Sequence, residues 1–205
     1  MTRRYDTVKR LIDLSVAGTG IVLTLPLQAA LAVVVRCKLG SPVLFRQVRP
    51  GMDGKPFTLV KFRSMANVDE AKGLVTDAQR LTPFGKALRS TSLDELPTLW
   101  NVVRGDMSLV GPRPLLMEYL DRYTTEQRRR HEVRPGITGL AQVSGRNEVP
   151  WDERFKLDVQ YVDSRSAALD LRILRRTIAQ VFMRSGISES GQVTMSKYGS
   201  AADSA

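Results

Sequence analysis

Residues 11–35 read LIDLSVAGTGIVLTLPLQAALAVVV, an apolar run long enough to cross a lipid bilayer. A helix that spans a bilayer needs about 20 such residues. The run is too long for a secretory signal peptide, and no small-residue cleavage pattern follows it. Pro26 lies near its middle and predicts a kink or a break, because proline lacks a backbone N–H and clashes with the preceding turn. This segment therefore predicts attachment to a membrane.

Basic residues flank the apolar run on both sides. They are Arg3, Arg4, Lys9 and Arg10 before it, and Arg36 and Lys38 after it. Loops rich in Lys and Arg stay on the cytoplasmic side of a membrane. A spanning helix would have no clear orientation here, whereas a helix that dips in, bends at Pro26 and returns would keep both flanks on the cytoplasmic side. The residues alone leave both alternatives open, because membrane helices tolerate proline.

The whole chain is strongly basic, with 31 Lys and Arg against 21 Asp and Glu, a formal net charge of +10 and a pI of about 10.2. This balance indicates anionic partners: nucleic acid, phosphorylated metabolites or an anionic membrane face. A length of 205 residues with 42% hydrophobic content allows one sizeable core. Cys37 is the only cysteine, so no internal disulfide can form. The single histidine, His131, lies among arginines, and we expect it on the solvated surface.

Residues 43–65, VLFRQVRPGMDGKPFTLVKFRSM, predict two strands around a turn, with Asp53 and Gly54 at its tight point. Side chains alternate along a strand, so Lys61 and Arg63 are expected on one face. Two cations at one end of a strand suit either a site that binds an anion or an edge strand whose charges prevent pairing with another chain. The pattern leaves both interpretations open.

Residues 89–105, RSTSLDELPTLWNVVRG, place Asp94 and Glu95 side by side after a Ser/Thr cluster. Ser92 and Glu95 have the spacing of a capping box, and acidic residues suit the positive end of a helix dipole. A helix N-terminus is also a good place to hold phosphate. The pattern predicts a helix that ends near Gly105 and leaves open whether the carboxylates cap it or perform chemistry.

The C-terminal half alternates loops with helical patterns. In residues 105–114, GDMSLVGPRP, two prolines flank Arg113 and predict a guanidinium held in one pose. Residues 115–131 have the periodicity of a helix. Residues 151–185 predict two helices that divide near positions 164–166, and the second is basic and amphipathic. Such a helix is typical of a membrane surface or of a core-facing helix with a solvated side.

Four segments together resemble the bacterial sugar transferase family. They are SPVLFRQVRPGMDGKPFTLVKFRSM (41–65), LRSTSLDELPTLWNVVRGDMSLVGPRPL (88–115), RPGITGLAQVSGRN (134–147) and KLDVQYVDSRSAALDLRIL (156–174). These proteins are monotopic polyprenol-phosphate phosphoglycosyl transferases, and the chain is similar to their minimal catalytic core. The resemblance implies transfer of a sugar phosphate from a UDP-sugar to a polyprenol phosphate such as undecaprenyl phosphate. It further implies release of UMP, a need for Mg²⁺, and a re-entrant helix-break-helix anchor.

The resemblance also implies roles for single residues. Asp94 matches the family's nucleophile, which forms a covalent aspartyl-phosphosugar intermediate, and Glu95 matches a magnesium-binding glutamate, so both carboxylates are expected at the metal. Cations and acids expected at the substrates are Lys61, Arg63, Arg89, Arg113, Arg146, Asp158 and Asp170. The last two would support magnesium or position the substrate, although Asp170 also suits a plain N-cap.

The re-entrant break departs from the family in one respect. Small members often have Ser-Pro at the break, whereas Leu25 precedes Pro26 here. Thr24 is the nearest hydroxyl, and it must replace the serine if a hydroxyl holds the bend.

These observations predict a helix-rich α/β fold, α+β-like, with a small β-hairpin and interfacial amphipathic helices. Residues 1–38 would form the re-entrant anchor, 39–185 the catalytic domain and 186–205 a flexible tail. The expected location is the cytoplasmic face of the bacterial inner membrane. The expected partners are a UDP-sugar, polyprenol phosphate and membrane lipids, without nucleic acid; a homodimer, the sugar and the pathway stay open. The alternative is a basic membrane-anchored scaffold without catalysis.

Overall fold

The computed structural model describes residues 4–145, 149–183 and Tyr198. The α-helices are α1 (Arg4–Leu39), α2 (Asp77–Arg80), α3 (Pro83–Ser90), α4 (Leu99–Arg104), α5 (Thr125–Arg128), α6 (Leu140–Val143), α7 (Trp151–Ser164) and α8 (Ala167–Met183). The strands are β1 (Leu44–Pro50), β2 (Pro56–Phe62), β3 (Ser108–Val110) and β4 (Gly136–Thr138). Short 3₁₀ helices are η1 (Met52–Gly54), η2 (Glu70–Lys72), η3 (Leu93–Thr98), η4 (Met117–Arg122) and η5 (Arg129–Glu132). The expected helix-rich fold with little sheet is confirmed.

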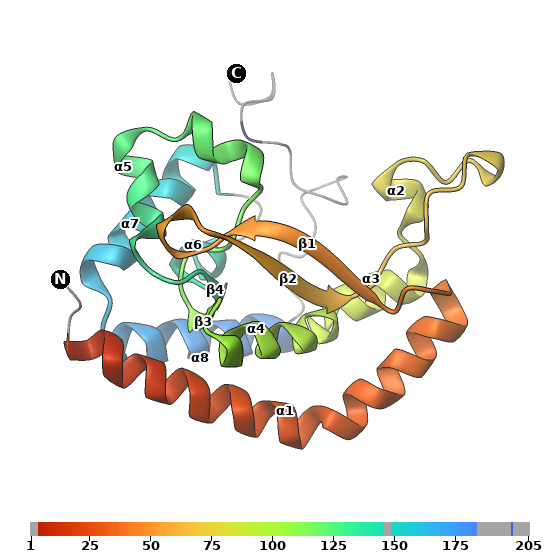
Figure 1. Ribbon diagram of the computed structural model, residues 1–205, viewed down its shortest axis with the longest axis horizontal. Helices are drawn as coiled ribbons and strands as arrows, with labels where there is room; N and C mark the ends of the chain where they lie inside the picture. Colours follow the sequence, from red (N-terminus) through yellow and green to blue (C-terminus); the bar gives the residue numbers. More distant parts are fainter. Residues whose placement is uncertain (1–3, 146–148, 184–197, 199–205) are drawn as a thin grey trace.

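Helix α1 is a single bent helix that runs along the lower edge of the molecule (Figure 1). Pro26 lies inside it without ending it, so the expected helix-break-helix is a bend in one continuous element. Thr24 Oγ1 donates to Gly20 O at 2.6 Å and accepts from Gln28 Nε2 at 2.9 Å. The first bond lies in the turn before Pro26, and the second spans Pro26. Thr24 is thus the hydroxyl next to the bend, and it is engaged on both sides.

The middle of α1 presents apolar side chains to its surroundings. The helix is long and apolar enough to cross a membrane by length and composition. Its most apolar stretch has a mean hydropathy of 1.9, and only 17% of that stretch is buried. Val22 and Leu23 are 71% and 75% exposed. This large apolar surface has no cover from the described part of the chain, which is typical of a surface in contact with lipid.

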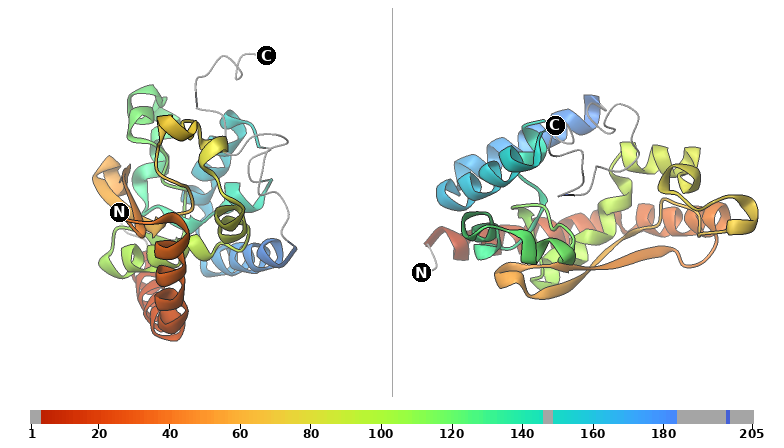
Figure 2. Two further views of the ribbon diagram at one scale, coloured as in Figure 1. Left: turned by 90° about the vertical axis from the view of Figure 1, so that its right-hand side faces the viewer. Right: turned by 90° about the horizontal axis from the view of Figure 1, so that it is seen from above.

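Both halves of α1 attach to the same globular part. In the first half, Arg10 donates to the carbonyls of Val102 at 2.6 Å and Val103 at 3.0 Å, near the C-terminal end of α4. A cation suits the free carbonyls at that end of a helix. In the second half, buried Val35 packs in a cluster with Phe62 and other residues of the hairpin and α3. Helix α8 also lies on this lower side, as the left view of Figure 2 shows.

The strands form two separate pairs, and the second pair brings two loops of the sequence together in space. Strands β1 and β2 form an antiparallel hairpin whose turn has Asp53 and Gly54 in the left-handed region, as expected. Strands β3 and β4 pair in parallel. A Cβ on Gly136 would lie 2.1 Å from the backbone nitrogen of Gly111, so only glycine permits this close approach. The pairing places the proline-rich loop after β3 beside the glycine-rich loop around β4.

Local signals predicted some helix boundaries well and others poorly. Helix α4 ends at Gly105, which has the left-handed conformation of a C-cap, and α7 and α8 divide at residues 165–166. The single helix expected over 115–131 is wrong: the segment consists of η4, α5 and η5. The capping box of Thr124 and Gln127 starts a new helix in its middle and explains the division.

Candidate active site

Asp94 and Glu95 lie in η3, the 3₁₀ turn between α3 and α4. Ser92 precedes it in the left-handed conformation, with φ of 56°, and its hydroxyl makes no capping bond. The capping box expected between Ser92 and Glu95 is therefore wrong, because the backbone at Ser92 turns the hydroxyl away from its cap position. The two carboxylates are left for other partners.

Cations from three separate elements surround this carboxylate pair. Lys61 of β2 contacts Glu95, with Nζ 2.5 Å from Oε1. Arg113, from the proline-rich loop, approaches the same oxygen with Nη2 at 3.3 Å. Arg89 of α3 bonds through Nε to Ser64 Oγ at 2.8 Å and acts electrostatically on Asp94. The structure thus brings together Asp94, Glu95, Lys61, Arg89 and Arg113.

The two neighbouring carboxyls have pKa values shifted in opposite directions. Burial, reinforced by the Glu95 charge, raises the pKa of Asp94 to about 6 although Lys61, Arg89 and Arg113 oppose the rise. Burial would also raise the pKa of Glu95, but Lys61 and Arg113 outweigh it and hold that pKa well below its ordinary range. Paired acids with divergent pKa values are typical of functional sites.

Two buried side chains outside the sequence-predicted site, Thr98 and Asn101, hold this arrangement in place. Asn101 accepts from Val60 N at 3.1 Å and donates to Thr58 O at 2.7 Å, and Thr98 donates to Val60 O at 2.9 Å. These bonds join the segment of Asp94 and Glu95 to β2, which keeps Lys61 against Glu95. The available signal was a pair of polar residues three apart in an apolar helical stretch.

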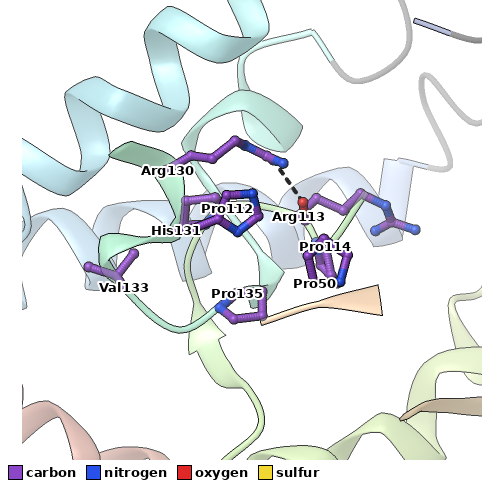
Figure 3. A pocket seen from close by; sticks show the side chains of 8 residues that line it. All are labelled: Pro50, Pro112, Arg113, Pro114, Arg130, His131, Val133 and Pro135. Carbon is purple, nitrogen blue, oxygen red and sulfur yellow. Dashed lines mark hydrogen bonds between the residues drawn. The ribbon is translucent and has the colours of Figure 1, made fainter. Parts of the chain in front are cut away.

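The loop that carries Arg113 is held from behind. Arg130 donates to the carbonyl oxygen of Arg113 at 2.8 Å, and Tyr161 OH donates to Val110 O at 3.0 Å. Figure 3 shows Arg130 and His131 on one side of a small cavity that Pro50, Pro112, Pro114 and Pro135 also line, with the Arg113 guanidinium pointing away from it. The backbone of Arg113 is therefore fixed while its side chain extends toward Glu95.

The other residues expected at the site are placed differently. Arg63 donates to Ser41 O at 2.9 Å and to Leu39 O at the end of α1, because β2 ends at Phe62 and the alternation of faces stops there. Asp158 is paired with Arg130 and Asp170 with Lys9, and neither is among the charges that shift the pKa of Asp94. Arg146 lies outside the described residues.

His131 is buried, not solvated as expected. It is 8% exposed, and its Nδ1 lies 3.1 Å from Gly51 O. Burial and the neighbouring Arg130 lower its pKa to about 4, so the ring is neutral at pH 7.

The donor set near Asp94 fits magnesium only in part. No cluster of three or more His, Cys, Asp or Glu is present in residues 4–145 and 149–183. Magnesium, however, is commonly held by one or two carboxylates together with substrate phosphates and water, in contrast to a dedicated cage. The adjacent carboxylates of Asp94 and Glu95 supply such a partial set, so the residues fit an ion that arrives with an anionic substrate.

Comparison with known proteins bears on the same segments. The family described as "Bacterial sugar transferase" matches residues 4–184. The chain is 51% identical to the uncharacterized sugar transferase EpsL of Bacillus subtilis, over 96% of this chain and 98% of that protein. It is 42% identical to a UDP-glucose:undecaprenyl-phosphate glucose-1-phosphate transferase of Klebsiella pneumoniae and 38% identical to one of Escherichia coli.

These alignments cover 85% and 87% of this chain but 40% and 43% of the Klebsiella and Escherichia proteins, so the chain spans about two fifths of their length. The alignment with EpsL, in contrast, covers both proteins almost completely. The resemblance inferred from the four sequence segments is confirmed, and with it the transferase class: the chain belongs to the bacterial sugar transferase family.

Proposed function

We propose that this protein moves a sugar-1-phosphate from a UDP-sugar to undecaprenyl phosphate and releases UMP. The observation that carries the proposal is the buried carboxylate of Asp94 beside Glu95 and three cations from separate elements. The names of several relatives, which specify glucose-1-phosphate transfer to undecaprenyl phosphate, support the substrate classes. The sugar itself is left open.

The proposed mechanism has two displacements at one phosphorus atom. A carboxylate oxygen of Asp94 attacks the sugar-bearing phosphate, the bond to the other phosphate breaks, and UMP leaves with that bond's electron pair. The sugar phosphate is then an acyl phosphate on Asp94. An oxygen of polyprenol phosphate attacks the same phosphorus, and Asp94 leaves as a carboxylate. Two steps avoid holding both anionic substrates together at once.

The surrounding residues have separate tasks in this scheme. Lys61, Arg89 and Arg113 offset the charge of the diphosphate, and the planar guanidinium groups suit phosphate oxygens. Glu95, with Asp94, would hold a magnesium ion that supplies further positive charge at the diphosphate. Burial keeps water from the acyl phosphate, which would otherwise hydrolyse.

The membrane attachment follows from the acceptor. A polyprenol phosphate stays in the bilayer, so the site must lie at headgroup level. We propose that residues 1–38 dip into the cytoplasmic face of the bacterial inner membrane as a monotopic anchor for a catalytic domain over residues 39–185. The exposed apolar middle of α1 and the attachment of both its halves to one globular part support a helix that returns.

A half-reaction without the lipid acceptor tests the proposal. A UDP-sugar and magnesium should release UMP in an amount limited by the enzyme, and leave a protein-bound sugar phosphate labile to hydroxylamine. Asp94→Asn should abolish both, because an amide is a poor nucleophile. UMP release that needs both substrates together would contradict the covalent mechanism and indicate direct transfer in a ternary complex.

A further inference from the structure

Arg49 is a half-buried cation on β1 that the proposed mechanism does not yet use. Its Nη2 donates to Gln47 Oε1 at 2.6 Å and its Nη1 lies 3.5 Å from Pro114 O, at the limit of a hydrogen bond. Its Nε is buried without a hydrogen-bond partner. Both acceptors are neutral oxygens, and no carboxylate pairs with Arg49 within residues 4–145 and 149–183. Guanidinium groups removed from water are ordinarily paired with an anion.

Arg113 is the cation that links Arg49 to the active site. Burial, together with the nearby Arg113 charge, lowers the pKa of Arg49 to about 10. Arg113 also acts on Asp94 and contacts Glu95. Pro114 directly follows Arg113, and its carbonyl lies near Arg49. Pro50 directly follows Arg49 and lines the same cavity as Arg113 and Pro114 (Figure 3). Two cations therefore stand next to each other with only one of them matched by a carboxylate.

The hairpin register shows where Arg49 lies relative to Lys61, the cation that contacts Glu95. Lys61 pairs with Phe45 and Arg49 pairs with Phe57, so the two cations are four residue positions apart along the hairpin. At a rise of about 3.3 Å per residue this separation is about 13 Å between backbones. The distance between the two charged groups is shorter than this, because both side chains are long. Arg113 acts on both ends of this row, through Glu95 and through Arg49. The cations thus extend from the carboxylate pair along the hairpin toward its turn.

We propose that Arg49 and Arg113 together bind the nucleotide-side phosphate of the UDP-sugar, the phosphate that leaves as part of UMP. This inference rests on the proposed function. Attack by Asp94 breaks the bond between the two phosphates, and the electron pair of that bond goes to the oxygen on the nucleotide side. A guanidinium fork beside that phosphate stabilises the charge as it develops. Arg49, further from Asp94 than Arg113, serves the leaving phosphate and not the transferred one.

The two half-reactions distinguish this role from a structural one. Arg49→Gln should slow the enzyme-limited release of UMP about 10- to 100-fold, the range expected for a lost hydrogen bond to a charged group. It should leave unchanged the transfer of an already trapped sugar phosphate to polyprenol phosphate, because the nucleotide has gone by then. Arg49→Lys should retain part of the first rate, since it keeps the charge but loses the fork.

The matched control is Arg46→Gln, an exposed arginine on the same strand, which should change neither rate. Equal slowing of both half-reactions by Arg49→Gln would assign Arg49 to structure and overturn the inference, as would an unchanged first step. If the wild-type protein shows no release without acceptor, the covalent function fails. The inference is then decided by inhibition: Arg49→Gln should raise the inhibition constant of UMP about 10- to 100-fold and leave that of undecaprenyl phosphate unchanged.

Discussion

Arg130 and Asp158 form a buried ion pair directly behind the active-site loop. Arg130 Nη2 lies 2.6 Å from Asp158 Oδ2, and the two side chains are 2% and 3% exposed. The same Nη2 donates to the carbonyl of Arg113 at 2.8 Å. Burial raises the pKa of Asp158, and Arg130 opposes that rise. Asp158 is therefore connected to the candidate active site through Arg130 and the backbone of Arg113.

Asp158→Asn should destabilise the protein by about 3–5 kcal/mol, because it leaves a buried arginine without its anion. Activity that survives should show an unchanged magnesium titration, because Asp158 is paired with Arg130 and does not contact the proposed metal-binding carboxylates Asp94 and Glu95. Thermal unfolding and metal titration measure the two effects. The double variant Arg130→Met with Asp158→Leu removes both charges and should recover much of the stability but not the rate. A shifted magnesium titration in Asp158→Asn would restore the metal-supporting role implied by the family resemblance.

Asp94→Asn should stabilise the fold while it abolishes activity. Folding raises the pKa of Asp94 from its ordinary 3.8 to about 6, so the folded state favours the neutral group. The difference in stability between the variant and the wild type should be close to zero below pH 4. It should grow in favour of the variant between pH 4 and 6, and stay constant above pH 6. The gain there is about 1–3 kcal/mol in the free energy of unfolding. Chemical denaturation of both proteins at pH 4 and pH 7.5 measures this gain. If the variant and the wild type were equally stable at both pH values, folding would not raise the pKa of Asp94.

The rate of UMP release by the free enzyme should rise with pH around a midpoint of about pH 6 and level off about one pH unit higher, because only ionised Asp94 attacks. The Glu95 charge is one cause of the raised pKa of Asp94. Glu95→Gln should therefore move the midpoint of this profile to lower pH, whatever it does to the plateau. Rapid-quench measurement across pH 4.5–8 tests both statements. An unchanged midpoint in Glu95→Gln would show that the Glu95 charge does not influence the pKa of Asp94.

Glu95→Gln should also weaken the apparent affinity for magnesium by about 10-fold or more, since it removes one of two carboxylates beside the substrate. Its effect on folding should be smaller than that of Asp158→Asn, because Glu95 is less deeply buried than Asp158. Glu70→Gln, on an exposed 3₁₀ turn, is the control and should leave the titration unchanged. An unaltered titration in Glu95→Gln would assign Glu95 to orienting Lys61 and Arg113.

The two ends of α1 should be accessible from the same side of the membrane. Native Cys37 is exposed near the C-terminal end of the helix. Val8, 52% exposed near the other end, offers a second labelling position as Val8→Cys in a Cys37→Ser background. A membrane-impermeant thiol reagent should reach both from the cytoplasmic side, as it reaches a Lys72→Cys control in the globular part. Labelling of the two ends from opposite sides would mean that α1 spans the bilayer.

Features that depend on neighbouring residues were readable from the sequence. The turn at Asp53 and Gly54, the glycine cap at Gly105 and the division between α7 and α8 follow from backbone preferences over a few residues. The apolar run around Pro26 follows from composition. The four sequence segments likewise indicated Asp94 and Glu95, and the capping alternative failed only when Ser92 proved to be left-handed.

Features that depend on which distant segments meet were decided by the tertiary structure. Arg63 and Lys61 are two residues apart, yet one caps α1 and the other binds Glu95, because the strand ends between them. Asp158 and His131 are polar in sequence but buried in the fold, where Arg130 and Gly51 become their partners. Arg49 stands out only once the fold has placed the loop of Arg113 and Pro114 against β1. Burial and charge pairing act through space, and a sequence orders residues only along the chain.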